Sequence, residues 1–305
     1  ACFLRDRNVS FASPDANDTL RSTSHQKSTM NYSYQPLSNH PIPEIASVLT
    51  QGFSGYFVPI NITPEALLQM ARQLSLDFTA SYMVCHDAHP VGVALVGRRG
   101  WSSRLAAMSI LPDYRGQGAG TSMLEQLISD SKARGEKAIV LEVIEQNEPA
   151  VKLYRKFGFT TVRRLTGYTK TTVSPAALNQ PSLQEIDLPE LARHVLQHGP
   201  NDLPWQLSGE TLGNFSLPTR AYQLDSAMLA LSDPTQPKIV LYSLLTLPDA
   251  RGKGKARQIV EAAMAQFQQR EWIVPALCPE EFGGFFAHLG FTKGEISQLQ
   301  MSLTH

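Results

Sequence analysis

Two short stretches of the chain, 136 residues apart, have nearly the same sequence. PDYRGQGAG occupies 112–120 and PDARGKGKA occupies 248–256, so that Pro, Asp, Arg and two glycines recur at the same places. FFAHLGF at 285–291 likewise matches LYRKFGF at 153–159, which lies 132 residues earlier. A repeat of roughly 130 residues has the length of a domain and not of a solenoid unit. The sequence therefore predicts two related domains in one chain.

The composition is that of a globular protein without a strong net charge. The 305 residues suit two domains, each large enough to bury a core. Lysine plus arginine equals aspartate plus glutamate, at 27 each, so no electrostatic argument favours nucleic acid or a membrane surface as a partner. Cys2, Cys85 and Cys278 lie far apart and form no disulfide framework. This cysteine usage favours a reducing, cytoplasmic location.

Changes of pattern along the chain suggest where the domains begin and end. The first residues are polar and lack periodicity, which predicts disorder, and Met30 could be the true start. The stretch SPAALNQPSLQ indicates a linker. The predicted division is a disordered extension at 1–30, a first domain at 31–173, a linker at 174–184 and a second domain at 185–305.

Apolar periodicity predicts strands and helices throughout the first domain. Thr63 is placed as an N-cap with Pro64 in the first turn, and Gly135 as the glycine that ends a later helix. The predicted helices cover 43–53, 63–74, 118–134 and a short segment ending at Gly158. The predicted strands cover 80–87, 90–99, 104–111 and 137–144, followed by a closing pair of strands to about 172.

The loop at 112–120 joins a strand to a helix and has the chemistry of an anion site. N–H groups in the first turn of a helix have no acceptor within the helix, and the helix dipole adds partial positive charge there. Glycines let the backbone approach an anion closely, and Arg115 adds a fixed charge suited to phosphate. A Walker Gly-Lys-Ser/Thr is absent, and Thr121 stands where the dinucleotide fingerprint needs its third glycine. The loop predicts a pyrophosphate cradle of another kind.

The spacing Arg115-x-x-Gly118-x-Gly120 resembles the acyl-CoA motif of the GNAT acetyltransferases, and NEPAVKLYRKFGF at 147–159 resembles the later motif of that family. The resemblance implies an α/β (α+β) fold of two tandem GNAT domains, each with a mixed central sheet flanked by helices. It also implies that the fourth and fifth strands of the catalytic domain splay apart, that acetyl-CoA lies in this gap as co-substrate, and that no metal is needed.

The resemblance further implies which residues bind acetyl-CoA. Backbone groups of a strand would pair with the pantetheine arm, the amides of the loop would hold the pyrophosphate, and Asn147 would bond the pantetheine. The residues assigned in this way are Met108, Ser109 and Ile110 in the strand, and Arg115, Gly116, Gln117, Gly118, Ala119 and Gly120 in the loop.

Two residues are candidates for the chemistry of acyl transfer. A phenol with a pKa near 10 can protonate a departing thiolate whose own pKa is near 8.5, and Tyr154 stands where the family keeps such an acid; the alternative is a packed core tyrosine. Glu142, on an apolar strand, either deprotonates the amine through water or is a structural carboxylate bonded to a backbone amide. The amide of Met108 or Ile110 would meet the oxyanion.

The second copy retains the glycine loop, but its counterparts of the catalytic residues cannot do the same chemistry. We predict a degenerate GNAT-like domain that packs on the first domain and shapes the acceptor site, with residual CoA binding left open. Pro275 is also expected to interrupt its strand. The expected counterparts are Phe286 for Tyr154, Pro279 for Asn147 and Val274 for Glu142, the last to within one residue.

The sequence thus favours an acetyl-CoA-dependent N-acetyltransferase that moves an acetyl group directly to an amine. The acceptor would be a small-molecule amine or a peptide N-terminus, and monomer or dimer is left open. The alternatives are a non-catalytic CoA-binding sensor or interaction module and, less favoured, a nucleotide-binding protein.

Two further groups of side chains carry an expectation. Arg98, Arg99 and Arg104 flank Trp101 in a predicted hairpin, which indicates a solvated turn. The aromatic residues within 53–57 either line the substrate pocket or are ordinary core.

Overall fold

The computed structural model of the chain describes residues 31–171, 181–268 and 270–305. The predicted extension at 1–30 and residues 174–180 of the predicted linker lie outside the described residues. The first half contains β1 (Tyr32–Pro36), η1 (Leu37–Asn39), α1 (Ile42–Gly52), α2 (Pro64–Leu74), β2 (Tyr82–His86), β3 (His89–Arg99), β4 (Ser102–Ile110), η2 (Pro112–Tyr114), α3 (Ala119–Ala133), β5 (Ala138–Ile144), α4 (Glu148–Lys156) and β6 (Thr160–Thr171). The second half contains β7 (Gln184–Ile186), α5 (Leu188–His198), η3 (Trp205–Leu207), α6 (Gly209–Gly213), β8 (Arg220–Leu224), β9 (Ala227–Leu231), β10 (Lys238–Thr246), η4 (Pro248–Ala250), α7 (Lys255–Gln266), β11 (Glu271–Pro279), η5 (Glu280–Phe282), α8 (Gly283–His288) and β12 (Thr292–Thr304).

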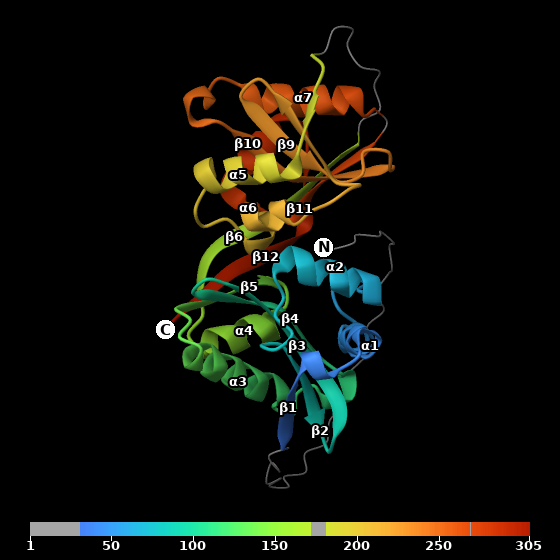
Figure 1. The fold of residues 1–305 in the computed structure, drawn as a ribbon, viewed down its shortest axis with the longest axis vertical. Coiled ribbons are helices and arrows are strands. Elements are labelled where there is room, and N and C mark those ends of the chain that lie inside the picture. Colours follow the sequence, from blue (N-terminus) through green and yellow to red (C-terminus); the bar gives the residue numbers. More distant parts are fainter. Residues whose placement is uncertain (1–30, 172–180, 269) are drawn as a thin grey trace, which may run out of the picture.

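The described strands form one twelve-stranded sheet in the order β1-β2-β3-β4-β5-β12-β6-β11-β10-β9-β8-β7. Most neighbouring strands are antiparallel, whereas β4 with β5 and β10 with β11 are parallel. Figure 1 shows the first half below and the second half above, with β6 and β12 crossing between them. The mixed sheet with flanking helices confirms the predicted fold class.

The two halves exchange their last strands. β12 of the second half pairs with β5 from Thr304↔Ala138 to Gln298↔Ile144, and β6 of the first half pairs with β11, while β6 and β12 pair with each other at the centre. The predicted closing pair of strands before residue 172 is therefore wrong, because β6 is one continuous strand and both its neighbours come from the second half. The linear division of the chain at 174–184 stays a prediction.

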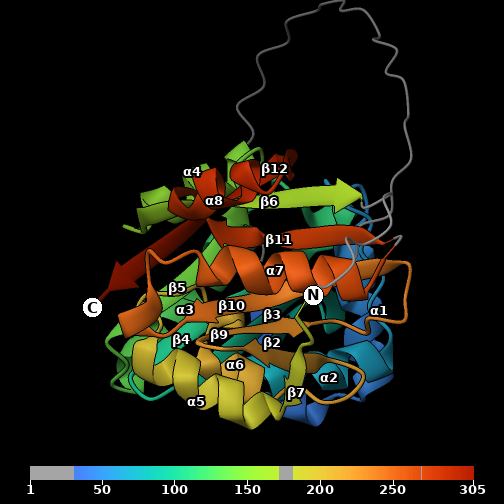
Figure 2. The same cartoon turned by 90° about the horizontal axis from the view of Figure 1, so that it is seen from above.

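Helices cover both faces of the sheet. In Figure 2, α2, α5 and α6 lie on one side and α4 and α8 on the opposite side. The exchanged strands take part in both cores: Leu299 and Met301 of β12 are buried in the core of the first half, and Tyr168 of β6 is buried in that of the second. Each half therefore depends on the other to complete its core. No helix of the described residues is long and apolar enough to cross a membrane.

The helix boundaries follow local signals that the sequence carries. The side chain of Thr63 caps α2 by accepting a hydrogen bond from the amide of Ala66 at 3.2 Å, with Pro64 in the first turn. Gly135 has a positive φ of 74° directly after α3, a conformation that glycine adopts without steric cost. Both predictions are confirmed.

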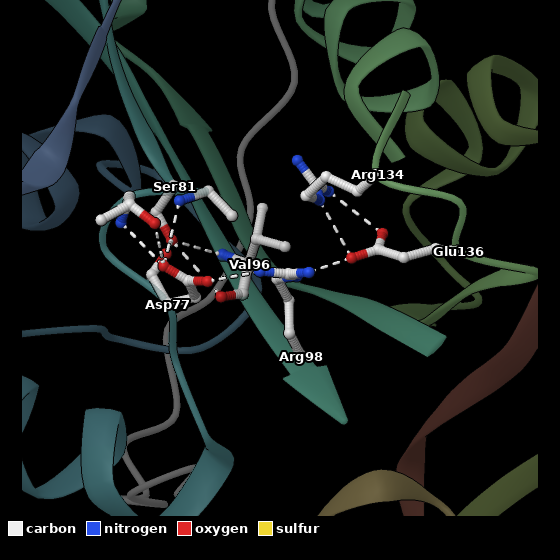
Figure 3. Close-up of polar contacts among 8 residues, drawn as sticks. Asp77, Ser81, Val96, Arg98, Arg134 and Glu136 are labelled. Atoms are coloured by element: carbon white, nitrogen blue, oxygen red, sulfur yellow. Dashed lines mark hydrogen bonds and ion pairs between the residues drawn. The ribbon is translucent and has the colours of Figure 1, made fainter. Parts of the chain in front are cut away.

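The predicted solvated turn around Trp101 is wrong for its arginines. Arg98 on β3 binds Asp77 at 2.8 Å and Glu136 at 2.6 Å, and Arg134 also contacts Glu136 (Figure 3). This network ties β3 to the segments that precede β2 and β5. Trp101 itself is exposed.

Arg99, the next residue, joins the first half to the second. Its guanidinium donates to the hydroxyls of Ser208 and Thr211 at 2.8 Å each and stacks 4.2 Å from the ring centre of Trp205. Burial lowers the pKa of Arg99 to about 10. The indole N–H of Trp205 donates in return to the carbonyl of Leu74 at 2.9 Å, at the end of α2. The segment around η3 is therefore anchored on the first half.

Candidate active site

β4 and β5 are parallel neighbours for only three residue pairs and then separate. The last pair is Arg104↔Val140, and the register of β4 against β3 shifts between Leu105 and Ala107, which marks a bulge at Ala106. Because a bulge bends its strand and increases the local twist, it directs β4 away from β5. The expected gap between the fourth and fifth strands is present.

The edge of β4 that borders this gap carries backbone groups not used by β3. The amide of Leu111 donates to Val91 at 2.9 Å, so Ser109, two residues earlier, also faces β3. In an antiparallel pair these positions alternate, so the backbone groups of Met108 and Ile110 face the gap. Of the three strand residues predicted to bind pantetheine, Met108 and Ile110 therefore direct their amides into the gap, and Ser109 directs its amide towards β3.

The loop after η2 presents a run of free amides. Among the described residues, no acceptor lies within hydrogen-bond reach of the N–H groups of residues 116–121. Gly116 and Gly118 have positive φ values of 73° and 91°, a conformation that L side chains adopt only with strain. The first turn of α3 carries no acidic side chain. These amides, at the start of a fifteen-residue helix, fit an anionic diphosphate.

The side chains of the loop are engaged elsewhere. The guanidinium of Arg115 donates to the carbonyls of Ile110 at 3.1 Å and of Gly52 and Ser54 at 2.9 Å each, so it ties the loop to the end of α1. The amide of Arg115 donates to Pro112 at 3.1 Å. These bonds use Nε and Nη2 and not Nη1, so the expected contribution of Arg115 to phosphate binding stays a prediction.

The loop, β4 and α4 meet at Gly120. A Cβ added to Gly120 would lie 3.3 Å from Leu153 of α4, 3.5 Å from Ile110 and 3.9 Å from Met108. The cradle, the free edge of β4 and the helix that carries Tyr154 thus come together in one place.

Tyr154 is buried on α4, against Phe159 at a ring distance of 5.7 Å. Burial, with a smaller contribution from the neighbouring phenol of Tyr56, raises the pKa of Tyr154 above its ordinary value. The phenol therefore keeps its proton at neutral pH and is a weaker acid than an exposed tyrosine. Tyr56 contacts Phe53 and Phe57 at ring distances of 5.1 and 5.4 Å, so the three aromatic residues within 53–57 form one cluster.

Asn147 stands at the start of α4 and acts as its N-cap. Its side-chain oxygen accepts from the amide of Ala150 at 3.4 Å, which leaves the amide nitrogen Nδ2 as its outward donor. The expected bond to pantetheine stays a prediction.

Glu142 lies on β5 two residues beyond the last pair with β4, and its side chain is 1% exposed. Its Oε2 accepts from Nε and Nη2 of Arg104 at 2.7 Å each and from Nε2 of Gln206 at 3.0 Å. Its partners are side chains and not a backbone amide, and both the catalytic and the structural interpretation of Glu142 stay predictions. Its second oxygen, Oε1, lacks a partner among the described residues.

Sequence reasoning missed Arg104 and Gln206 as neighbours of Glu142. Arg104 carried a signal, since an arginine and a glutamate on adjacent inner strands can be expected to pair. Gln206 carried none, because it belongs to the second half and lies 64 residues from Glu142.

Comparisons with known proteins agree with the fold. Residues 49–159 match the model of the acetyltransferase (GNAT) family. This segment of the chain belongs to the GNAT superfamily. The matched range contains the gap, the glycine loop, Glu142 and Tyr154.

Among relatives, the chain is similar to N-alpha-acetyltransferase 30 of Schizosaccharomyces pombe, at 38% identity over 64 residues, which covers 21% of the chain and 43% of the relative. It is also similar to the [ribosomal protein bS18]-alanine N-acetyltransferase of Escherichia coli K12, at 40% identity over 67 residues, or 21% of the chain and 44% of the relative. The matches thus span less than half of each of these relatives.

A solved structure has the same architecture over nearly the whole chain. A tandem GNAT protein from the clavulanic acid biosynthesis pathway aligns with a TM-score of 0.60 and 12% identity, and the alignment covers 90% of this chain and 98% of the other. At this identity the likeness shows the fold alone.

Proposed function

We propose that this GNAT protein is an acetyltransferase that moves an acetyl group from acetyl-CoA directly to an amine. The convergence at Gly120 carries the proposal, because it joins the amide cradle, the free edge of β4 and the helix of Tyr154. The family match and the N-acetyltransferase relatives support it.

Each part of the site has a task in this proposal. The amides of residues 116–121 would hold the pyrophosphate, and the backbone of Met108 and Ile110 would bond the pantetheine and the thioester oxygen. Acetyl-CoA supplies the thioester. The amine nitrogen bonds to the thioester carbon, the carbon–sulfur bond breaks, and the sulfur takes the proton of Tyr154. The amine gives up its own proton to Glu142, directly or through water.

We place the chemistry in the predicted first domain, residues 31–173, with β12 and η3 supplied by the second. The acceptor class we propose is a small-molecule amine or a peptide N-terminus, and the names of the relatives support the latter. We also propose a cytoplasmic location, since Cys85 and Cys278 are buried free thiols in separate cores.

Titration calorimetry with acetyl-CoA tests the donor site. We expect one molecule bound per chain and loss of binding in Gly118→Glu, which places a carboxylate in the cradle. Gly254→Glu, at the matching glycine of the second loop with a φ of 73°, is the control and should keep the stoichiometry of one. No binding to the unmodified chain would refute the proposal.

A further inference from the structure

Four polar side chains from both halves meet beside the gap between β4 and β5. Arg104 and Glu142 come from the first half and are 6% and 1% exposed at their side chains. Gln206 comes from η3 of the second half and binds Glu142 directly. Gln300 comes from β12 and is the register partner of Glu142. We call these four residues the junction cluster.

The geometry keeps the members of the junction cluster close together. Register partners on antiparallel strands direct their side chains to the same face of a sheet, so Gln300 lies on the face of Glu142. Nε2 of Gln300 donates to the carbonyl of Asp202 at 3.4 Å, four residues before Gln206. The segment 202–206 therefore reaches both members of the β5–β12 pair from the same side.

The junction cluster contains several polar atoms that are buried and unpaired. Oε1 of Glu142, Oε1 of Gln206 and Oε1 of Gln300 have no hydrogen-bond partner among the described residues, and neither does Nη1 of Arg104. Buried polar atoms are normally satisfied, so a concentration of exceptions calls for an explanation. The set consists of three acceptors and one donor, which is the complement of a ligand that brings N–H donors and one acceptor oxygen.

The charges narrow the ligand class further. The ion pair of Arg104 with Glu142 cancels, so the cluster offers no net charge and suits a neutral amine. A neutral amine donates through its N–H bonds and keeps its lone pair for the thioester carbon. An oxygen on the neighbouring carbon atom would accept from Nη1 of Arg104.

We infer that the junction cluster binds the acceptor, that the acceptor is an α-amino carbonyl compound such as an amino acid amide or a peptide N-terminus, and that Gln206 and Gln300 of the second half are specificity-determining residues. The inference rests on the proposed acetyl transfer. It gives the second half a direct part in the active site of the first.

Matched amines test the ligand class. L-Alaninamide and isopropylamine differ in one branch, a carboxamide against a methyl group, and are compared at equal concentrations of neutral amine. We expect acetyl transfer from acetyl-CoA to L-alaninamide with a kcat/KM at least about tenfold higher than to isopropylamine, in line with one hydrogen bond to a charged partner. Equal use of the two amines would overturn the assignment.

Variants test the part played by the second half. We expect Gln206→Met and Gln300→Met each to raise the KM for L-alaninamide by about tenfold or more, with the Kd for acetyl-CoA unchanged. The unchanged Kd shows that the fold is intact. Gln223→Met on β8 is the control for the substitution itself, since its side chain donates to Asp225. Unaltered KM values in both junction variants would refute the role of the second half.

Failure of the inference can be separated from failure of the proposed function. If the chain binds one acetyl-CoA but acetylates neither amine, the acceptor class is wrong and the donor site stands. If acetyl-CoA does not bind, the proposed function fails, and this inference fails with it.

Discussion

The two halves of the sheet have the same backbone where their inner strands diverge, but different side chains. In both halves the parallel pair ends after three residues, at Arg104↔Val140 and at Val240↔Ile273. Just beyond these pairs, the register of β4 against β3 shifts, and so does that of β10 against β9. Arg104 thus corresponds to Val240. Glu142, two residues past Val140, corresponds to Pro275, two residues past Ile273, which is within one residue of the predicted Val274.

The same correspondence holds on the exchanged strands and on the helices. Gln300, four residues before Thr304, corresponds to Gly167, four residues before Thr171, since these ends pair with the matching first residues of β5 and β11. Phe286, the counterpart of Tyr154, stacks on Tyr168 at a ring distance of 5.1 Å. Around the second gap, the positions that match Arg104, Glu142, Gln300 and Tyr154 are therefore apolar or glycine.

The glycine loops, by contrast, are alike. Gly252 and Gly254 have positive φ values of 72° and 73°, and Arg251 donates to the carbonyls of Thr246 and His198, as Arg115 does to those of Ile110 and Gly52. The arginine therefore recurs where the side chains proposed for catalysis do not. The repeated Pro-Asp-x-Arg-Gly motif thus has a structural role in both loops, and the proposed acid and base lie outside it.

The largest effect we expect is on kcat and comes from the one hydroxyl that distinguishes Tyr154 from its counterpart Phe286. Tyr154→Phe should lower kcat about 10²–10⁴-fold, because the departing thiolate loses its proton donor, with little change in the Kd for acetyl-CoA. The converse variant, Phe286→Tyr, should leave kcat unaltered. Steady-state kinetics on both variants measures this, and wild-type kcat in Tyr154→Phe would remove its role as the acid.

Core substitutions on the exchanged strands should act on the opposite half. Met301→Ala, on β12, should destabilise the protein by about 2–5 kcal/mol in urea unfolding and speed hydrogen exchange on β5 more than on β11. Tyr168→Ala on β6, the counterpart of Met301, should speed exchange on β11 more than on β5. Exchange confined to the half that carries the substitution in sequence would contradict the coupling.

The arginines of the two loops should contribute similarly to stability and differently to binding. Arg115→Ala and Arg251→Ala should each cost about 1–3 kcal/mol in thermal or urea unfolding, because carbonyls lose charged donors. Arg115→Ala alone should raise the Kd for acetyl-CoA, by loosening the loop. Complete loss of binding without loss of stability would instead mean that the guanidinium contacts phosphate.

The smallest effect we expect is on the loss of stability at low pH. Burial acts to raise the pKa of Asp77 and of Glu136, but hydrogen bonds from Thr79 and Arg98 to the former, and from Arg134 and Arg98 to the latter, outweigh it and lower the pKa values from 3.8 and 4.5 to about 2. Because both are lowered on folding, their contribution to stability is present above about pH 4.5 and is lost as the pH falls towards 2.

Asp77→Asn and Glu136→Gln should therefore flatten the fall of Tm over this pH range. Asp233→Asn is the matched variant in the second half, where hydrogen bonds from Thr235 lower the pKa of a surface carboxyl, and it should change the slope less. Differential scanning calorimetry between pH 2 and 5 makes the measurement, and equal slopes in all variants would contradict the assignment.

Much of the fold and of the glycine loop could be predicted from sequence, because the signals that determine them are local. The caps of α2, the bounds of α3 and the loop glycines depend on residues a few positions apart. The order of strands at the centre could not be predicted, since a repeat makes β6 and β12 equally suitable partners for β5. The contacts of Arg98, Arg99 and Arg104 could not be predicted for a related reason, which is that their partners are distant in sequence. Glu136 lies 38 residues from Arg98, and Ser208 lies 109 residues from Arg99.

The exchange of strands also determines when the first half can complete its fold during synthesis. Ala138 on β5 pairs with Thr304 on β12. During synthesis, the edge of β5 beside Glu142 therefore stays unpaired until almost all of the described chain has left the ribosome. Such distant pairing makes folding slow, and an unpaired inner edge attracts other strands. A nascent chain of this design is expected to need protection of β5 and β6 until β12 has been made.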